Sequence, residues 1–166
     1  MRMTETPVTT EVERLAQELA EVCLGSQAVV ATAESLTGGQ LAAAITAAPE
    51  ASKWYRGGVV AYQPSAKHTL LRSPDGPVVT APTAIAMACS VAELLDADYA
   101  VGVTGVGGPD TEEGEQPGTV YLASCDRGQH PIVERHEFAG STVEVLEQTI
   151  EVALHTLIAR VRDRGD

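Results

Sequence analysis

The spacing of apolar residues predicts long helices near both ends of the chain. At 8–24 the apolar side chains recur every three or four positions and leave an acidic outer face, which predicts a helix. Thr9 or Thr10 is suited to cap its first turn, and Gly25 is suited to end it. A second amphipathic helix is predicted over 141–162, with arginines in its last turn, where the helix dipole favours positive charge.

Between these helices, strand-like and helical segments alternate. Short β-branched or alternating runs predict strands over 28–33, 57–62, 99–103, 120–124 and 132–138, and the last two are expected to pair. Further helices are predicted over 40–48, 64–71 and 82–95, the last of them capped by Thr80. The alternation predicts a single three-layer α/β/α domain over 1–166, built on a mixed, mostly parallel sheet.

Composition and charge narrow the class of protein. The chain has 166 residues, with 23 acidic and 11 basic side chains and a formal net charge of −12. This balance argues against a nucleic-acid partner, because no basic stripe is present to neutralise phosphates. No apolar run approaches the ~20 residues of a membrane span. Residues 1–25 contain five glutamates and no apolar signal-peptide core, so we expect a cytoplasmic protein without a membrane partner.

Cysteine and histidine spacing gives no sign of a metal or a disulfide framework. Cys23, Cys89 and Cys125 are far apart and form no C-x-x-C pair, which is typical of reduced thiols. The four histidines form no H-x-x-x-H pair. We therefore expect neither a metal site nor a cofactor.

The first segment with candidate chemistry lies at 32–39, with the sequence Thr-Ala-Glu-Ser-Leu-Thr-Gly-Gly. A strand is expected to deliver Ser35 to a tight turn directly before a helix, which brings a hydroxyl and free backbone N–H groups to the sheet edge. Such groups can hold a phosphate or stabilise an oxyanion. The alternative is that Ser35 and Thr37 only cap the helix, while Gly38 and Gly39 relieve crowding.

The second segment runs from Tyr62 to Lys67, after the strand predicted at 57–62. A nucleophilic serine needs a base, and no histidine has a comparable position at a strand end. Lysine can act as the base where its pKa is lowered, and Tyr62 can orient the amine or relay its proton. The alternative is a solvated Lys67 and a core-packed Tyr62. A nicotinamide-dependent dehydrogenase is disfavoured, because the Tyr–Lys spacing is one residue longer than Y-x-x-x-K and the glycine-rich first turn is absent.

The third segment is Val-Gly-Val-Thr-Gly-Val-Gly-Gly-Pro at 101–109. Glycines after a strand permit close backbone approach and anion-binding conformations. The dinucleotide-binding pattern G-x-G-x-x-G is not met, because Pro109 and an acidic loop stand where the helix would begin. A simple turn is the alternative.

Four motifs, in this order, resemble the CinA C-terminal domain family. They are A-E-S-x-T-G-G at 33–39, R-G-G-V-V-A-Y-x-x-x-x-K at 56–67, T-G-x-x-G-P at 104–109 and P-G-T-V-Y at 117–121. The resemblance runs from about 12 to 157. Since stand-alone members are nicotinamide-nucleotide amidases, it implies conversion of nicotinamide mononucleotide to nicotinic acid mononucleotide and ammonia, with no cofactor. It also suggests a homodimer.

The resemblance further implies roles for individual residues. Ser35 would be the nucleophile and Lys67 its base, with Tyr62 assisting through hydrogen bonds to that pair. The substrate-binding residues would be Thr37, Gly38, Gly39, Arg56, Thr104, Gly105 and Gly108.

The chain departs from the family pattern at two places. Leu36 replaces the usual cysteine after the nucleophile, and Ser141 and Thr142 replace an Asp-Arg pair. Losing one charge-assisted contact to a phosphate costs about 1.5–3 kcal/mol, so nicotinamide mononucleotide is expected to bind more weakly here. Two alternatives therefore stay open: an amidase for a different carboxamide, and a non-catalytic nucleotide-binding or assembly module.

Overall fold

The computed structural model describes residues 10–164, in which helices and strands alternate as predicted. The helices are α1 (Glu11–Ser26), α2 (Gln40–Thr46), α3 (Ala51–Trp54), α4 (Pro64–Leu71), α5 (Ala81–Leu94) and α6 (Thr142–Asp163). The strands are β1 (Val30–Glu34), β2 (Tyr55–Val60), β3 (Tyr99–Gly105), β4 (Thr119–Asp126) and β5 (Ile132–Glu137). Within these residues, no helix is long and apolar enough to cross a bilayer.

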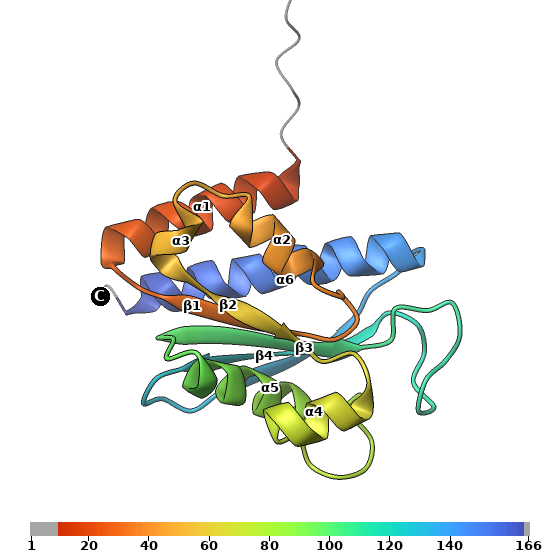
Figure 1. Ribbon diagram of the computed structural model, residues 1–166. Coiled ribbons are helices and arrows are strands. Elements are labelled where there is room, and N and C mark those ends of the chain that lie inside the picture. The colour runs from red at the N-terminus through yellow and green to blue at the C-terminus, as the bar shows by residue number, and fades with distance from the viewer. Residues whose placement is uncertain (1–9, 165–166) are drawn as a thin grey trace, which may run out of the picture.

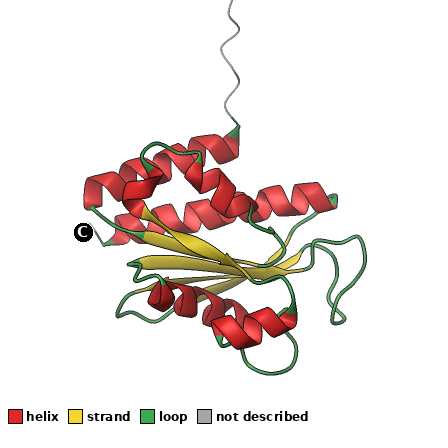
Figure 2. Ribbon diagram, in the orientation of Figure 1, coloured by secondary structure: helices red, strands yellow, loops and turns green. Residues whose placement is uncertain are grey.

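The five strands form one mixed sheet in the order β2-β1-β3-β4-β5. β1 pairs in parallel with β2 and β3, whereas β4 is antiparallel to β3 and to β5. Four strands therefore point the same way, and β4 alone is reversed. Figures 1 and 2 show α1, α2, α3 and α6 on one side of the sheet and α4 and α5 on the other. The predicted three-layer fold with a mixed sheet is confirmed.

Each face of the sheet has its own apolar core, because side chains alternate along a strand. On the side of α1 and α6, the core includes Val30, Val101 and Trp54. On the side of α4 and α5, it includes Ala31 and Met87. The strands β1 and β3 are buried on both faces, which explains their nearly continuous apolar sequences.

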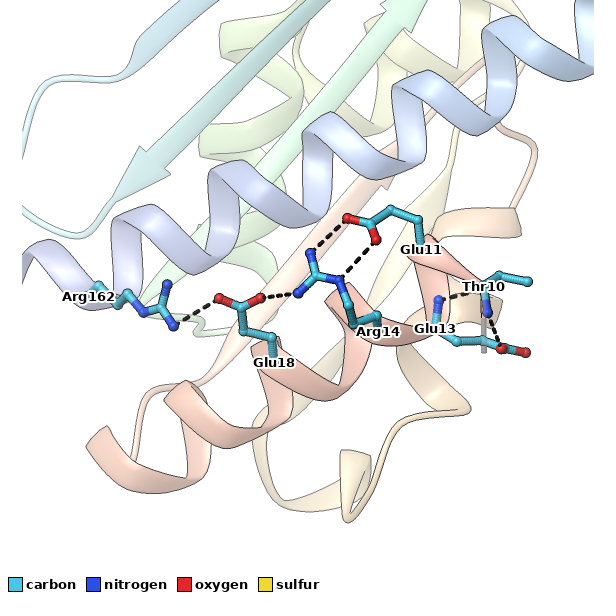
Figure 3. A network of polar contacts seen from close by, with 6 residues as sticks. All are labelled: Thr10, Glu11, Glu13, Arg14, Glu18 and Arg162. Atoms are coloured by element: carbon cyan, nitrogen blue, oxygen red, sulfur yellow. Dashed lines mark hydrogen bonds and ion pairs between the residues drawn. The ribbon is translucent and has the colours of Figure 1, made fainter. Parts of the chain in front are cut away.

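The helix ends follow the capping signals of the sequence. Thr10 accepts a hydrogen bond from the N–H of Glu13, whose carboxylate in turn accepts from the N–H of Thr10 (Figure 3). The first helix thus begins with a complete capping box, and Thr10 is the cap rather than Thr9, which lies outside the described residues. Thr80 caps α5 as predicted, and Ser141 caps α6.

An ion-pair chain joins the first and last helices across the surface. Arg14 pairs with Glu11 and Glu18 on its own helix, and Glu18 also pairs with Arg162 of α6 (Figure 3). These side chains are partly or largely exposed to solvent, so the pairs contribute little to stability. The packing of α1 against α6 therefore depends on the apolar contacts beneath them.

Among the differences from the sequence prediction, three have a clear local description. The first helix continues through Gly25, and Gln27 adopts the left-handed conformation that ends it. The short helix α3 was not predicted, since a single turn is too short to show a helical period. Strand β2 starts and ends two residues earlier than expected, so Tyr62 lies in the loop after it.

Gly102 lets α5 pack directly on the centre of the sheet. A Cβ atom added at this position would lie 2.6 Å from the backbone nitrogen of Ala88 and 2.8 Å from the carbonyl oxygen of Ala84. Both atoms belong to the helix backbone, which cannot move aside as a flexible side chain can. The distance between α5 and β3 therefore requires glycine here.

We predict that Gly102→Ala lowers the free energy of unfolding by about 1–3 kcal/mol, because the added methyl group forces α5 off the sheet. The corresponding fall in Tm is roughly 2–12 °C, measurable by calorimetry. The matched control is Gly25→Ala in α1, because no atom lies within 4 Å of a Cβ added at Gly25. The control is expected to be neutral or stabilising by up to about 1 kcal/mol. Equal effects of the two substitutions would contradict this account of the packing.

Candidate active site

The motifs singled out in the sequence converge on one small cavity beyond the carboxyl ends of β1 and β3. The cavity has a volume of about 130 Å³ and is lined by Ser35, Leu36, Tyr62, Lys67, Val78, Val79, Thr104, Gly105 and Glu112. Because β1 and β3 are parallel neighbours, the segments that follow them meet at the same sheet edge. This is where open α/β sheets commonly bind ligands.

Ser35 is the first residue after β1 and lies at the cavity wall. Its side chain is largely buried, and the residue is 5% exposed. Two turns follow it, closed by hydrogen bonds from the N–H of Gly38 to Ser35 and from the N–H of Gln40 to Thr37. Gly38 and Gly39 both have positive φ, which lets the chain reverse directly into α2.

The buried carboxylate of Glu34 caps α2. It accepts a hydrogen bond of 2.6 Å from the hydroxyl of Thr37, and bonds of 2.9 and 3.1 Å from the backbone N–H groups of Leu41 and Ala42. These are helix N–H groups that the sequence analysis assigned to a ligand. In the structure, Glu34 already occupies that end of α2, so α2 is not the expected anion site.

Other backbone N–H groups of the turn remain candidates for stabilising an oxyanion. Within the described residues, the N–H groups of Leu36, Thr37 and Gly39 have no hydrogen-bond acceptor in the protein, and of these three residues Leu36 lines the cavity whereas Thr37 and Gly39 do not. The side chain of Thr37 has no exposed surface and is committed to Glu34. The expected contribution of Thr37 to substrate binding is therefore limited to its backbone.

Lys67 lies on α4 with its amine beside the cavity. The residue is 3% exposed, and its Nζ donates a 3.1 Å hydrogen bond to the carbonyl oxygen of Tyr62. Burial lowers the pKa of Lys67, and the carboxylates of Glu112 and Glu113 oppose part of that change. An amine in this environment loses its proton more readily than an exposed lysine, which a general base requires.

Tyr62 lines the cavity but its side chain is 70% exposed. The carbonyl oxygen holds Lys67, whereas the phenolic hydroxyl makes no hydrogen bond to Ser35 or Lys67. The structure thus gives Tyr62 a backbone contact with the lysine. It does not show the side-chain contact that the resemblance implied, nor the core-packed tyrosine of the alternative.

The acidic loop after β3 adds a residue that the sequence analysis did not include in the site. Glu112 lines the cavity, and of the two carboxylates that raise the pKa of Lys67 it has the larger effect. Paired backbone hydrogen bonds between Glu112 and Glu115 shape the loop. The carboxylate of Glu113 accepts bonds of 2.8–3.1 Å from the N–H groups of Val78 and Val79, which fixes the loop over the cavity. The only sequence signal was the run of acids beside a glycine.

The other predicted binding residues are divided between the cavity and its surroundings. Thr104 and Gly105 line it, although the Thr104 hydroxyl donates to the carbonyl oxygen of Val78. Gly108 lies outside the lining and approaches Thr142, whose Oγ1 would be 3.5 Å from an added Cβ. Thr142, which stands where the family pattern has an arginine, therefore lies beside the glycine-containing turn that follows β3.

Arg56 is not brought to this site. The residue is exposed near the start of β2, where its neighbour Gly57 pairs with Ala31. Ser35 lies four residues beyond Ala31, which is about 13 Å along the strand. The structure therefore gives the cavity one cationic side chain among its lining residues, Lys67. Across the described residues, no three His, Cys, Asp or Glu side chains are grouped to hold a metal ion.

Comparison with known proteins places these features in a family. A model of the CinA C-terminal domain matches residues 12–161. A putative competence-damage inducible protein of Levilactobacillus brevis is 37% identical over 149 residues, covering 86% of this chain and 36% of that protein. The chain spans about a third of the length of several such relatives.

Shorter relatives match over nearly their whole length. Nicotinamide-nucleotide amidohydrolase PncC of Escherichia coli is 33% identical over 153 residues, covering 89% of this chain and 93% of that protein. The crystal structure of a competence damage-inducible protein A from Klebsiella pneumoniae superimposes with a TM-score of 0.87 at 31% identity. That superposition covers 92% of this chain and 98% of the other.

We predict that Glu34→Gln lowers the free energy of unfolding by about 1.5–3 kcal/mol, because an amide cannot accept all the hydrogen bonds that the carboxylate receives. Denaturant titration measures the change. The control is Glu50→Gln, which removes a partly exposed pair with Lys53 and is expected to cost less than about 1 kcal/mol. A Glu34 variant as stable as the control would show that the cap is dispensable.

Proposed function

We propose that this chain, which belongs to the CinA C-terminal domain family, is a serine amidohydrolase. In this proposal it converts nicotinamide mononucleotide to nicotinic acid mononucleotide and ammonia. One observation carries the proposal: Ser35 and Lys67 line the same small cavity, and Lys67 is buried there. The full-length match to a relative named as an amidohydrolase supports the reaction class.

In the first half of the reaction, Ser35 attacks the carbon of the substrate carboxamide. The hydroxyl proton passes to Nζ of Lys67, which must be neutral to receive it, and a C–O bond forms. The carboxamide oxygen becomes an oxyanion, and the free N–H group of Leu36, which lines the cavity, is the candidate to stabilise it. Lys67 then returns the proton to the amide nitrogen, the C–N bond breaks and ammonia leaves.

In the second half, water hydrolyses the acyl-serine. Lys67 is neutral again once ammonia has left, so it can take a proton from the attacking water. The second tetrahedral intermediate collapses as Lys67 returns that proton to the oxygen of Ser35, and the released carboxylic acid loses its own proton to solvent to become a carboxylate. The product carries one negative charge more than the substrate, and Glu112 in the cavity lining favours its release by repulsion.

The charges of the cavity suit the pyridinium ring better than the phosphate. The pyridinium of nicotinamide mononucleotide is cationic, and Glu112 offers it a carboxylate. For the phosphate, the lining supplies one cation, Lys67, which must be neutral during catalysis. Backbone N–H groups of the loops are left to hold the phosphate. This lack of basic side chains favours, as a second candidate function, hydrolysis of a carboxamide without a phosphate.

We predict that Ser35→Ala reduces ammonia release from nicotinamide mononucleotide by about 10³-fold or more, because the nucleophile is lost. Lys67→Met is expected to act similarly through loss of the base. Released ammonia is measured directly, and binding of the mononucleotide by calorimetry, which Ser35→Ala should leave within a few-fold of wild type.

The controls use residues of the same type away from the cavity. Ser26→Ala and Lys53→Met, on α1 and α3, are expected to keep wild-type rates. Turnover retained in Ser35→Ala would overturn the mechanism. If the wild-type protein binds the mononucleotide but releases no ammonia from it, parallel assays with nicotinamide and nicotinamide riboside distinguish a different amidase from a non-catalytic module.

We also predict that Glu112→Gln moves the acidic limb of kcat/KM to lower pH. The rate rises with pH as Lys67 loses its proton, and the carboxylate of Glu112 favours the protonated form. Removing that charge lowers the pKa of Lys67 further, so the neutral base is present at lower pH. A pH–rate profile measures the shift. Glu21→Gln, on the exposed side of α1, is the control and should leave the profile unchanged. A shift to higher pH would contradict the assignment of Lys67.

A further inference from the structure

A second cavity, at the opposite end of the sheet, brings two cysteines together. Cys89 on α5 and Cys125 on β4 both line a cavity of about 470 Å³, which also includes Asp96, Asp126 and Arg127. Neither thiol is fully buried, and both are free. The cavity shares no lining residue with that of Ser35.

The close packing of α5 on the sheet explains why the two thiols meet. Ala88, next to Cys89, sits directly over Gly102, and Ala123, two residues before Cys125, belongs to the same small apolar cluster as Ala88. Short side chains on both elements leave little distance between helix and strand. The side chains of Cys89 and Cys125 therefore reach the same cavity, one from the helix and one from the strand.

We propose that Cys89 and Cys125 form a peroxide-reactive dithiol, in which Cys89 is the attacking sulfur and Cys125 the resolving one, and which closes to an intramolecular disulfide. Nothing in the proposed amide hydrolysis uses either residue, so this site stands independently of that function. Its substrate class is a small hydroperoxide, which fits an open cavity of this size.

The surroundings of the two sulfurs divide the roles between them. The neighbouring thiol of Cys125 lowers the pKa of Cys89 to about 7, and the thiol of Cys89 raises the pKa of Cys125. The carboxylate of Asp126 also raises the pKa of Cys125, while Arg160 acts in the opposite direction. Asp126 is 5% exposed, and within the described residues neither its Oδ1 nor the Nε and Nη2 of Arg160 have a hydrogen-bond partner. One thiolate beside one thiol is the combination that a two-step oxidation requires.

The chemistry balances with hydrogen peroxide as the oxidant. The thiolate of Cys89 attacks one peroxide oxygen, an S–O bond forms, the O–O bond breaks, and the departing hydroxide takes a proton to become water. The sulfur of Cys125 then attacks the sulfenic sulfur of Cys89. The S–S bond forms, the S–O bond breaks, and a second water leaves with the thiol proton of Cys125. The dithiol loses two electrons, and the peroxide gains them.

Cys23 provides an internal reference for this reaction. It is buried in α1 within the core on the far side of the sheet, and burial raises its pKa to about 12. A buried neutral thiol reacts slowly with peroxide, so Cys23 should stay reduced under conditions that oxidise the pair.

The test treats the whole chain with hydrogen peroxide, then denatures it and labels the remaining thiols with iodoacetamide. The untreated protein should take three labels, and the oxidised protein one, on Cys23, with intact mass showing the loss of two hydrogens. Peptide mapping should show Cys89 linked to Cys125, and dithiothreitol should restore three labels. A chain that keeps all three labels, or that forms a disulfide between molecules, would overturn the proposal.

Variants assign the two roles. Cys89→Ser should slow peroxide-dependent thiol loss by at least about 10-fold, because the low-pKa thiolate is gone. Cys125→Ser should let the sulfenic acid of Cys89 accumulate, which dimedone traps. Cys23→Ser should oxidise like wild type. If either variant of the pair unfolds, as a thermal melt would reveal, the corresponding alanine variant replaces it. Wild-type rates of thiol loss in folded Cys89→Ser would show that Cys89 is not the attacking sulfur.

Discussion

The site is organised by a single buried carboxylate, that of Glu34. Glu34 is the last residue of β1, and its carboxylate accepts a hydrogen bond from the hydroxyl of Thr37. The same carboxylate caps α2 by accepting hydrogen bonds from the N–H groups of Leu41 and Ala42. Because a buried charge without partners is very costly, the turn between Glu34 and α2 has little freedom to rearrange. Ser35 stands inside that turn, so its position is set by the hydrogen bonds of its neighbour rather than by any bond of its own hydroxyl.

Electrostatics in this molecule operate over short distances. The net charge of −12 repels an anionic substrate as a whole, yet the cavity contains a buried lysine that burial drives toward neutrality. The carboxylates of the loop after β3 partly restore its basicity. The pKa of Lys67 thus follows from a local balance between its burial and two glutamates.

Much of this arrangement could be predicted from the sequence, for identifiable reasons. The spacing of apolar residues and the capping residues located the long helices. A cap such as Thr10 or Thr80 can be recognised in the sequence because it bonds to an N–H group only three residues away. The expectation that a strand end delivers Ser35 to a turn rested on the same local signals. Glu34 and Glu112 were missed as site residues, because their roles depend on partners that a periodic pattern does not encode. The meeting of Cys89 and Cys125 depends on how closely α5 packs at Gly102, which is a property of the assembled sheet.

The loop that carries Glu112 and Glu113 is attached to the rest of the molecule by few contacts. It is held by paired backbone bonds within itself and by one carboxylate on two N–H groups, and its residues from Asp110 to Gly114 are exposed. Substitutions in it therefore need not disturb the apolar layers. A substitution at Glu112 can therefore change the charge that acts on Lys67 while the sheet and its two layers of helices keep their packing.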